Sequence, residues 1–411
     1  MIRSLSYSEV QTALTCQARW DMSYSDQLAG SSLRRRQIAP ILSDGRAWGA
    51  GVAAWHADQD LPGLEAQWSD LNAMWVAHEA MFRSYSDDVM EQGERGILVP
   101  LSEQVERKDR LGVILDHYMA TAEPMGGTLT RLEDQFVVSV PSRGGKRAST
   151  KYRLMGYLDG FTIIDGQQWI VEFKLRKQLQ AVEQIQLSRQ IRWYAFALTR
   201  LQGGSAPVGV IVDERLNEAP KPARIVKGRK AGTFAPSHDK AQLTTPEAYI
   251  ALCAEFEEEP HDDVVEALSQ REWQRRTSII FRPGELEEAG RELTSAAMMI
   301  RDLDSGDRYP IRNAQAHLCG GCDFRSICAA PTDEWTVSVG FERKAPKRDL
   351  PPVEATAAQA AVAGTVAASL PATVESESTG SQRPSSDVSV GSPSAGGSPY
   401  PYSTTQGAVT A

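Results

Sequence analysis

The stretch GYLDGFTIIDGQQWIVEFK, residues 156–174, predicts two β-strands joined by a tight turn. Asp165-Gly166 separates two runs rich in aromatic and β-branched residues, which is a strong signal for a hairpin. Asp159 closes the first strand, and Glu172 and Lys174 stand two apart in the second. Side chains two apart on a strand point to the same face, and the hairpin brings Asp159 near Glu172. The stretch therefore predicts two carboxylates and a lysine at one place.

This acidic pair and its lysine favour metal-assisted hydrolysis of a phosphodiester. Glu172 sits in an apolar strand, where an unpaired carboxylate is costly. Mg²⁺ prefers one or two carboxylates together with waters and substrate phosphates. The metal would polarise the scissile phosphate and lower the pKa of a bound water, while Lys174 orients that water or stabilises developing charge. The alternative is a buried ion pair without catalytic function, because D…E-x-K is a short pattern.

Four neighbouring residues extend this candidate site. Glu133 lies on the strand expected at 131–141 and is a candidate metal ligand. Gln190 and Tyr194 are four apart and share one face of the helix that follows the strand of Glu172, so that helix can lie over the site. His56 is a further candidate ligand. A single histidine in a helical segment is more often structural, and a partly buried helix face is the alternative for Gln190 and Tyr194.

The order of the expected elements predicts an α/β protein. Two helical regions come first, strands and helices then alternate, and a cysteine-rich segment follows, which together indicate a mixed sheet flanked by helices. The helices are expected near 6–24, 43–95, 180–201, 245–269 and 283–303, and the strands at 131–141, 151–164, 167–175 and 207–214.

The composition indicates a folded body with a different C-terminal end. No apolar run approaches the ~20 residues that span a bilayer, and no signal peptide is recognisable, so we expect a cytoplasmic protein without a membrane segment. From Pro351 onward the chain is mainly Ala, Ser, Thr, Pro, Gly and Val, which cannot bury enough apolar surface to order it. We expect residues 1–345 to form the folded domain, with a core at about 130–215, and residues 346–411 to form a disordered tail.

The formal charge of −9 does not by itself indicate a nucleic-acid-binding protein. Three segments are nonetheless basic, at 34–36, 142–153 and 221–232, and they could line a channel for a phosphate backbone. For any one of these segments, a solvated loop is the alternative. The candidate DNA-binding residues are Arg143, Lys146, Arg147, Lys151, Lys227, Arg229 and Lys230.

Three of the five cysteines lie within HLCGGCDFRSIC, residues 317–328. A small and odd number of cysteines in a cytoplasmic protein is typical of metal binding or catalysis rather than of a disulfide framework. A metal or iron–sulfur site needs a fourth ligand, and both Cys253 and Cys16 are available for it.

The motifs, taken in order, resemble the PD-(D/E)XK nuclease superfamily. They are most similar to its RecB-like exonuclease branch, which includes the CRISPR-associated RecB-type nucleases and bacteriophage relatives. The similarity covers roughly residues 4–330. One feature departs from the family pattern, because the family places its histidine four residues after the glycine, where this chain has Ala53. The matching residues are Ser6, Ser8, Cys16, Gly49, His56, Glu133, Gly156, Asp159, Glu172, Lys174, Gln190, Tyr194, Cys319, Cys322 and Cys328.

This resemblance implies a PD-(D/E)XK restriction-endonuclease-like core with a C-terminal iron–sulfur lobe at about 310–330. It implies a four-iron, four-sulfur cluster held by Cys16, Cys319, Cys322 and Cys328, and a four-cysteine zinc site is the alternative. Cys253 is then an ordinary free cysteine.

The resemblance also implies an activity. We expect an Mg²⁺- or Mn²⁺-dependent DNA exonuclease that acts at single-stranded ends in recombination, repair or replication. The alternatives are a structure-specific endonuclease, a spacer-processing nuclease that works with an integrase or recombination partners, and a catalytically idle DNA-binding protein.

Overall fold

The computed structural model describes residues 2–25, 33–35, 39–58, 66–123, 125–127, 129–130, 134–142, 147–203, 205–228, 233–329 and 341–343. The chain divides into two units, Met1–Glu354 and Ala355–Ala411, and every described residue belongs to the first. The predicted tail at 346–411 therefore lies outside the described residues.

The described strands form two larger sheets and two short ribbons. The central sheet has the strand order β11-β8-β7-β6-β3, and the second sheet has the order β1-β5-β4. The strands are β1 (Arg3–Ser6), β2 (Leu33–Arg35), β3 (Leu129–Thr130), β4 (Asp134–Pro141), β5 (Ala148–Leu158), β6 (Gly160–Ile164), β7 (Gln167–Arg176), β8 (Gly209–Leu216), β9 (Ile225–Lys227), β10 (Phe234–Pro236), β11 (Gln274–Ile280) and β12 (Phe341–Arg343).

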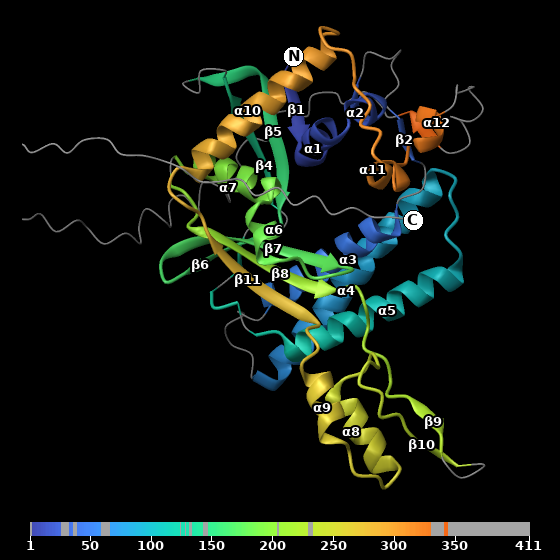
Figure 1. The fold of residues 1–411 in the computed structure, drawn as a ribbon. Helices are drawn as coiled ribbons and strands as arrows, with labels where there is room; N and C mark the ends of the chain where they lie inside the picture. Colours follow the sequence, from blue (N-terminus) through green and yellow to red (C-terminus); the bar gives the residue numbers. More distant parts are fainter. Residues whose placement is uncertain are drawn as a thin grey trace, which may run out of the picture. The chain divides into compact units, whose positions relative to one another are not determined.

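Helices cover both faces of the central sheet (Figure 1). They are α1 (Tyr7–Thr15), α2 (Gln17–Tyr24), α3 (Pro40–Asp58), α4 (Ala66–Glu94), α5 (Leu101–Thr121), α6 (Val182–Gln186), α7 (Arg189–Leu201), α8 (Pro246–Glu255), α9 (Asp262–Ser269), α10 (Glu285–Asp304), α11 (Ala316–Gly320) and α12 (Arg325–Ala329). The helix α7 lies on one side of the sheet, and α3, α4 and α5 lie on the other. A mixed sheet flanked by helices is the α/β architecture that the sequence predicts.

The predicted hairpin is present as β6 and β7, which pair antiparallel. Asp165 and Gly166 form its turn with φ angles of 51° and 75°. Both residues therefore adopt the left-handed conformation that a two-residue hairpin turn requires. On its other edge β7 pairs with β8 in parallel, so the strand of Glu172 lies in the middle of the sheet.

The central sheet separates two apolar cores, because successive side chains of β7 point to opposite faces. Val171 and Phe173 pack in a core with residues of α3, α4 and α5. Ile170 packs in the other core, with residues of α7, α10 and the second sheet. Glu172 and Lys174 share the face of Ile170, so the candidate site belongs to the side that α7 covers.

Some elements differ from the sequence prediction. The helix expected near 6–24 is divided at Cys16, whose extended backbone ends α1 and begins α2. The strand β1 precedes it and pairs in parallel with β5. The helix expected at 180–201 is likewise divided, between α6 and α7. At the start of α1 the Ser6 side chain accepts a hydrogen bond from the Glu9 N–H and so caps the helix.

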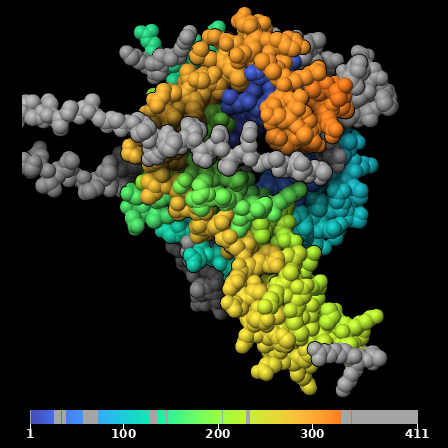
Figure 2. All heavy atoms as spheres, viewed as in Figure 1, coloured from blue at the N-terminus to red at the C-terminus, as the bar shows by residue number. Residues whose placement is uncertain are grey.

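Residues 217–273 leave the sheet after β8 and return to it as β11. They contain the β9–β10 ribbon and the helices α8 and α9, which have a small apolar core of their own. Figure 2 shows this segment, in yellow-green and gold, as a lobe that extends from the rest of the described body. Because it follows the end of β8 that lies beside Lys174 and Arg176, the lobe begins near the candidate site.

Within the described part of the chain, no helix has both the length and the apolar run that a bilayer crossing requires.

Candidate active site

Lys174 bridges the two carboxylates of the predicted site. Its Nζ lies 2.5 Å from Glu172 Oε2 and 3.2 Å from Asp159 Oδ2. The backbone N–H of Phe173 also donates to Asp159 Oδ2, at 3.0 Å. The end of β5 and the middle of β7 thus bring these three side chains together, as the hairpin in the sequence predicts.

Glu172 has no exposed surface, whereas the Asp159 side chain is 31% exposed. No described residue makes a hydrogen bond to Glu172 Oε1, and the contact of Oε2 is the ion pair with Lys174. Burial is the main cause that raises the pKa of Glu172, to about 7, against the opposing effect of Lys174. Burial lowers the pKa of Lys174, but the two carboxylates outweigh it and raise that pKa overall. The site therefore holds a buried carboxylate with unused acceptor capacity beside a charged lysine.

Gly156 lets the helix residue Tyr194 approach this site. The glycine is the register partner of Phe136 on β4. A Cβ atom at position 156 would lie 2.6 Å from Phe136 Cζ and 2.9 Å from Tyr194 Cζ, so any side chain there would displace both rings. Burial raises the pKa of Tyr194, and the Glu172 carboxylate raises it further, while the hydrogen bond with Gln190 opposes them. Tyr194 is therefore near enough to Glu172 to be influenced by its charge, and Gln190 makes a hydrogen bond with Tyr194.

His56 lies on the other face of β7. Its ring stacks on Phe173, with the ring centroids 5.5 Å apart and an angle of 12° between the planes. Its Nε2 lies 3.0 Å from the Tyr118 hydroxyl, which donates to Asp213 at 3.0 Å. Burial and then Arg276 lower the pKa of His56 to about 3. The structure does not bring His56 to the carboxylates, because the sheet lies between them.

The remaining predicted ligand, Glu133, lies outside the described residues. Among those residues, no three or more His, Cys, Asp or Glu side chains are arranged to hold a metal ion. Asp159 and Glu172 are thus the predicted ligands that the structure brings together. Mg²⁺ typically takes one or two carboxylates from a protein and completes its coordination with waters and substrate phosphates.

Cys16 and Cys319 both contact Asn313. The Asn313 N–H donates to Cys16 Sγ at 3.5 Å, and Cys319 Sγ lies 3.8 Å from the Asn313 carbonyl oxygen. Cys322 and Cys328 follow on the same short segment, and all four are half-buried. Cys253 is fully buried in the separate core of α8 and α9.

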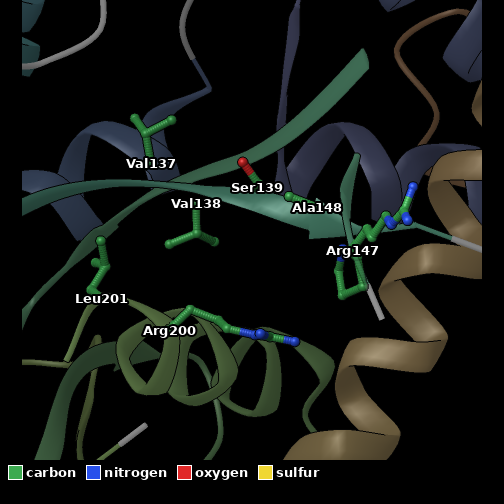
Figure 3. Close-up of a pocket in the computed structure, with 8 residues that line it drawn as sticks. Val137, Val138, Ser139, Arg147, Ala148, Arg200 and Leu201 are labelled. Atoms are coloured by element: carbon green, nitrogen blue, oxygen red, sulfur yellow. The ribbon is translucent and has the colours of Figure 1, made fainter. Parts of the chain in front are cut away.

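The described basic candidates lie at two different places. Arg147 lines a pocket of about 330 Å³ opposite Arg200 of α7 (Figure 3). This pocket is at the Pro141–Ala148 end of the β4–β5 hairpin, and Gly156 is at the other end. Lys151 is exposed on β5, and Lys227 is exposed on β9 of the lobe. Arg143, Lys146, Arg229 and Lys230 lie outside the described residues.

Several polar residues beside the site were not singled out by the sequence analysis. Glu214 has no exposed surface and lies on β8 next to Lys174, and Arg176 and Arg275 contact it. The signal was present in the stretch VDERL, residues 212–216, where two acids and an arginine end a strand that is otherwise buried. A buried strand that ends in charged residues predicts a polar cluster at that edge of the sheet.

Comparison with known proteins identifies the superfamily. The family model described as the PD-(D/E)XK nuclease superfamily matches residues 4–329. The chain therefore belongs to the PD-(D/E)XK nuclease superfamily, and the fold and the clustered Asp159, Glu172 and Lys174 agree with that membership.

The similarity to solved structures is weaker. A candidate exonuclease from Eubacterium rectale is 9% identical, with 80% of this chain and 92% of that chain covered and a TM-score of 0.32. The protein SSO0001 is 12% identical, with 61% of this chain and 80% of that chain covered and a TM-score of 0.26. No curated protein sequence matches the chain. The assignment to the superfamily rests on the family match.

Proposed function

We propose that this nuclease is a divalent-metal-dependent DNA exonuclease that hydrolyses phosphodiester bonds at single-stranded ends, in recombination, repair or replication. The observation that carries the proposal is the fully buried Glu172, which has an oxygen without a hydrogen-bond partner among the described residues and lies beside Asp159 and Lys174. Such an arrangement is costly in a folded protein unless a cation uses it.

The donor set fits Mg²⁺ or Mn²⁺. Both ions take oxygen ligands, and Asp159 and Glu172 present carboxylates on one side of β7. Asp159 is partly exposed, which leaves space for waters and for a substrate phosphate. A divalent cation bound there supplies a Lewis acid for a phosphate oxygen and lowers the pKa of a bound water.

The residues of the chain have separate roles in this proposal. Asp159 and Glu172 hold the cation. Lys174 stays charged despite its partial burial because the two carboxylates raise its pKa, so it stabilises negative charge that develops on the phosphate or orients the attacking water. Tyr194 is neutral, and its hydroxyl, together with Gln190, positions the substrate over the carboxylates.

A cleavage assay with linear and circular DNA tests the proposed activity. Labelled single-stranded and double-stranded DNA would be incubated with Mg²⁺ or Mn²⁺, with EDTA as the control. We expect release of nucleotides from linear single strands, no cleavage of circular single strands, and no activity in EDTA. Cleavage of circles would indicate an endonuclease, and DNA binding without cleavage under all conditions would indicate an idle binding protein.

We further propose that Cys16, Cys319, Cys322 and Cys328 hold a four-iron, four-sulfur cluster, with zinc as the alternative metal. The contacts of Cys16 and Cys319 with Asn313 support this proposal, because they bring Cys16 beside a segment that lies 297 residues further along the chain. A cluster at this position would fasten the start of α2 to the segment of α11 and α12. Its role would be structural, as that of metals in small domains often is.

A further inference from the structure

Three charged side chains form one row across the central sheet, beside the candidate active site. In the parallel pair β7–β8, Lys174 is the register partner of Glu214. In the antiparallel pair β8–β11, Glu214 is the register partner of Arg275. Register partners on neighbouring strands point to the same face, so this row lies on the face that carries Glu172. Arg176, two residues beyond Lys174 on β7, points to that face as well.

Glu214 holds both arginines in place. Its Oε1 accepts from Arg176 Nε at 3.2 Å and from the Gln180 backbone N–H at 3.4 Å. Its Oε2 lies 3.5 Å from Arg275 Nη2. Glu214 is fully buried, and a buried carboxylate between two guanidinium groups is strongly held. Two positive groups therefore share one buried negative group.

Both arginine side chains are partly exposed, by 31% for Arg176 and 28% for Arg275, although Nε of Arg275 is buried. Arg176 Nη2 donates to Gln180 Oε1 at 2.7 Å, and Arg275 Nη2 donates to the Gln180 carbonyl. Each guanidinium has five N–H donors, so these contacts leave donors for a further acceptor. The planar fork of an arginine fits a phosphate group particularly well.

The spacing of Lys174 and Arg176 is suited to a single-stranded nucleic acid. Residues two apart on a β-strand lie roughly 6.6 Å apart, which is comparable to the distance between successive phosphates of an extended single-stranded nucleic acid. We propose that Arg176 and Arg275 bind the phosphate next to the scissile one, and that Glu214 positions both arginines. This inference rests on the proposed function, because the scissile phosphate is assigned to Asp159 and Glu172.

The competing explanation is that the arginines only fasten the loop after β7 to the sheet. In that case DNA binding would not depend on them.

Glu272 separates the two explanations. Its Oε2 lies 3.5 Å from Arg275 Nη1, and its side chain is 52% exposed. If Arg275 binds a phosphate, Glu272 repels that phosphate and competes for the arginine. Glu272→Gln should then tighten DNA binding a few-fold.

The first test uses the wild-type protein, so no variant has to fold. A series of single-stranded oligonucleotides would each carry one neutral methylphosphonate linkage, and the cleavage site and KM would be measured with Mn²⁺. We expect a several-fold rise in KM when the neutral linkage is next to the cleaved bond. Cleavage that is insensitive to the neighbouring linkages would overturn the subsite while leaving the proposed function intact. Absence of cleavage of the unmodified strand would overturn both.

The second test assigns the subsite to the two arginines. Binding of a single-stranded oligonucleotide would be measured by fluorescence anisotropy in Ca²⁺ at several KCl concentrations. Each neutralised phosphate contributes about −0.7 to the slope of log K against log salt for single strands. Because the two arginines share one phosphate, Arg176→Gln and Arg275→Gln should each make the slope less steep, by at most about 0.7 together. Arg282→Gln is the matched control, because this arginine is 83% exposed beyond the opposite end of β11.

The two tests together give a decisive pattern. We expect Arg275→Gln to bind the methylphosphonate strand and the unmodified strand equally, and Arg282→Gln to retain the wild-type difference. An Arg275→Gln protein that melts cooperatively, keeps the wild-type salt slope and still distinguishes the two strands would overturn the proposal.

Discussion

The ammonium group of Lys174 lies 2.5 Å from the carboxylate of Glu172, which has no exposed surface. Burial raises the pKa of this carboxyl to about 7 even with the lysine beside it. The folded protein thus keeps a carboxylate at a position where its charge costs stability. Such a conflict is expected where function, rather than stability, selects the residue.

Glu172→Gln should weaken the pH dependence of the stability of the metal-free protein. A carboxyl whose pKa is higher in the folded state than in the unfolded state costs stability as the pH rises from about 4.5 through about 7. The amide removes this cost, but it also takes from the half-buried Lys174 its ion-pair partner, which opposes the gain. Thermal unfolding in EDTA at pH 5 and pH 8 separates the two effects. We expect the stability of the variant relative to wild type to rise by about 1–3 kcal/mol from pH 5 to pH 8, and a difference that does not change with pH would argue against the unfavourable buried charge.

Lys174→Ala should separate metal binding from catalysis. The substitution leaves both carboxylates in place, so Mn²⁺ should still bind, with equal or higher affinity because a competing cation is gone. Turnover should fall by at least about 10²-fold, the typical cost of losing one group that stabilises developing charge. Isothermal titration with Mn²⁺ and a cleavage assay on the same preparation measure both properties. Loss of Mn²⁺ binding in this variant would contradict the assigned roles.

Gly156→Ala should displace Tyr194. The added methyl group would meet the rings of Phe136 and Tyr194 at less than 3 Å, and overpacking of this kind typically costs about 1–3 kcal/mol. Cleavage should fall as well, because Tyr194 lies near the Glu172 carboxylate. Gly49→Ala is the control, since nothing lies within 4 Å of a Cβ atom at that helical position. A Gly156→Ala protein with unchanged melting temperature and activity would contradict the packing described for Tyr194.

His56→Gln should reduce stability without changing the affinity for Mn²⁺. His56 lies across the sheet from Glu172, and its contact is the buried hydroxyl of Tyr118. Loss of that buried contact should cost about 1–3 kcal/mol. Tyr118→Phe removes the same contact from the other side and serves as the comparison. A tenfold weaker affinity for Mn²⁺ in His56→Gln, but not in Tyr118→Phe, would show that His56 is a ligand.

The proposed cluster has a visible signature. Protein purified without oxygen should absorb broadly near ~400 nm, as thiolate-bound iron does, whereas a zinc site is colourless. Cys16→Ser and Cys319→Ser should both remove the colour, although the two residues are 303 positions apart (319 − 16). Cys253→Ala should keep it, because Cys253 is buried in the core of the lobe. Colour that survives Cys16→Ser but not Cys253→Ala would overturn the assignment of the ligands.

The local parts of the site could be predicted from the sequence because they depend on short-range rules. The turn at Asp165 and the two-residue spacing of Glu172 and Lys174 determine which side chains share a face. The position of Tyr194 near the site could be predicted because its helix comes soon after the strand of Glu172. These relationships involve residues close in sequence, where periodicity is informative.

The rest depends on contacts between distant segments. His56 has the residue type of a metal ligand, but the packing of α3 decides that it faces Phe173 instead. Glu214 becomes the neighbour of Lys174 through the pairing of β8 with β7, and Arg275 reaches Glu214 only through the pairing of β8 with β11, which was not among the predicted strands. The break at Cys16 likewise depends on its contacts with the segment around Asn313, far along the chain.

The cleavage rate of Glu172→Ala is the most direct test of the central claim, that Asp159, Glu172 and Lys174 form a metal-dependent hydrolytic site. The measurement is release of label from linear single-stranded DNA in saturating Mn²⁺, with Arg282→Gln as the control for handling and folding. We predict that Glu172→Ala melts cooperatively, binds the DNA and releases no label above the EDTA background. Cleavage by Glu172→Ala at the wild-type rate would contradict the account.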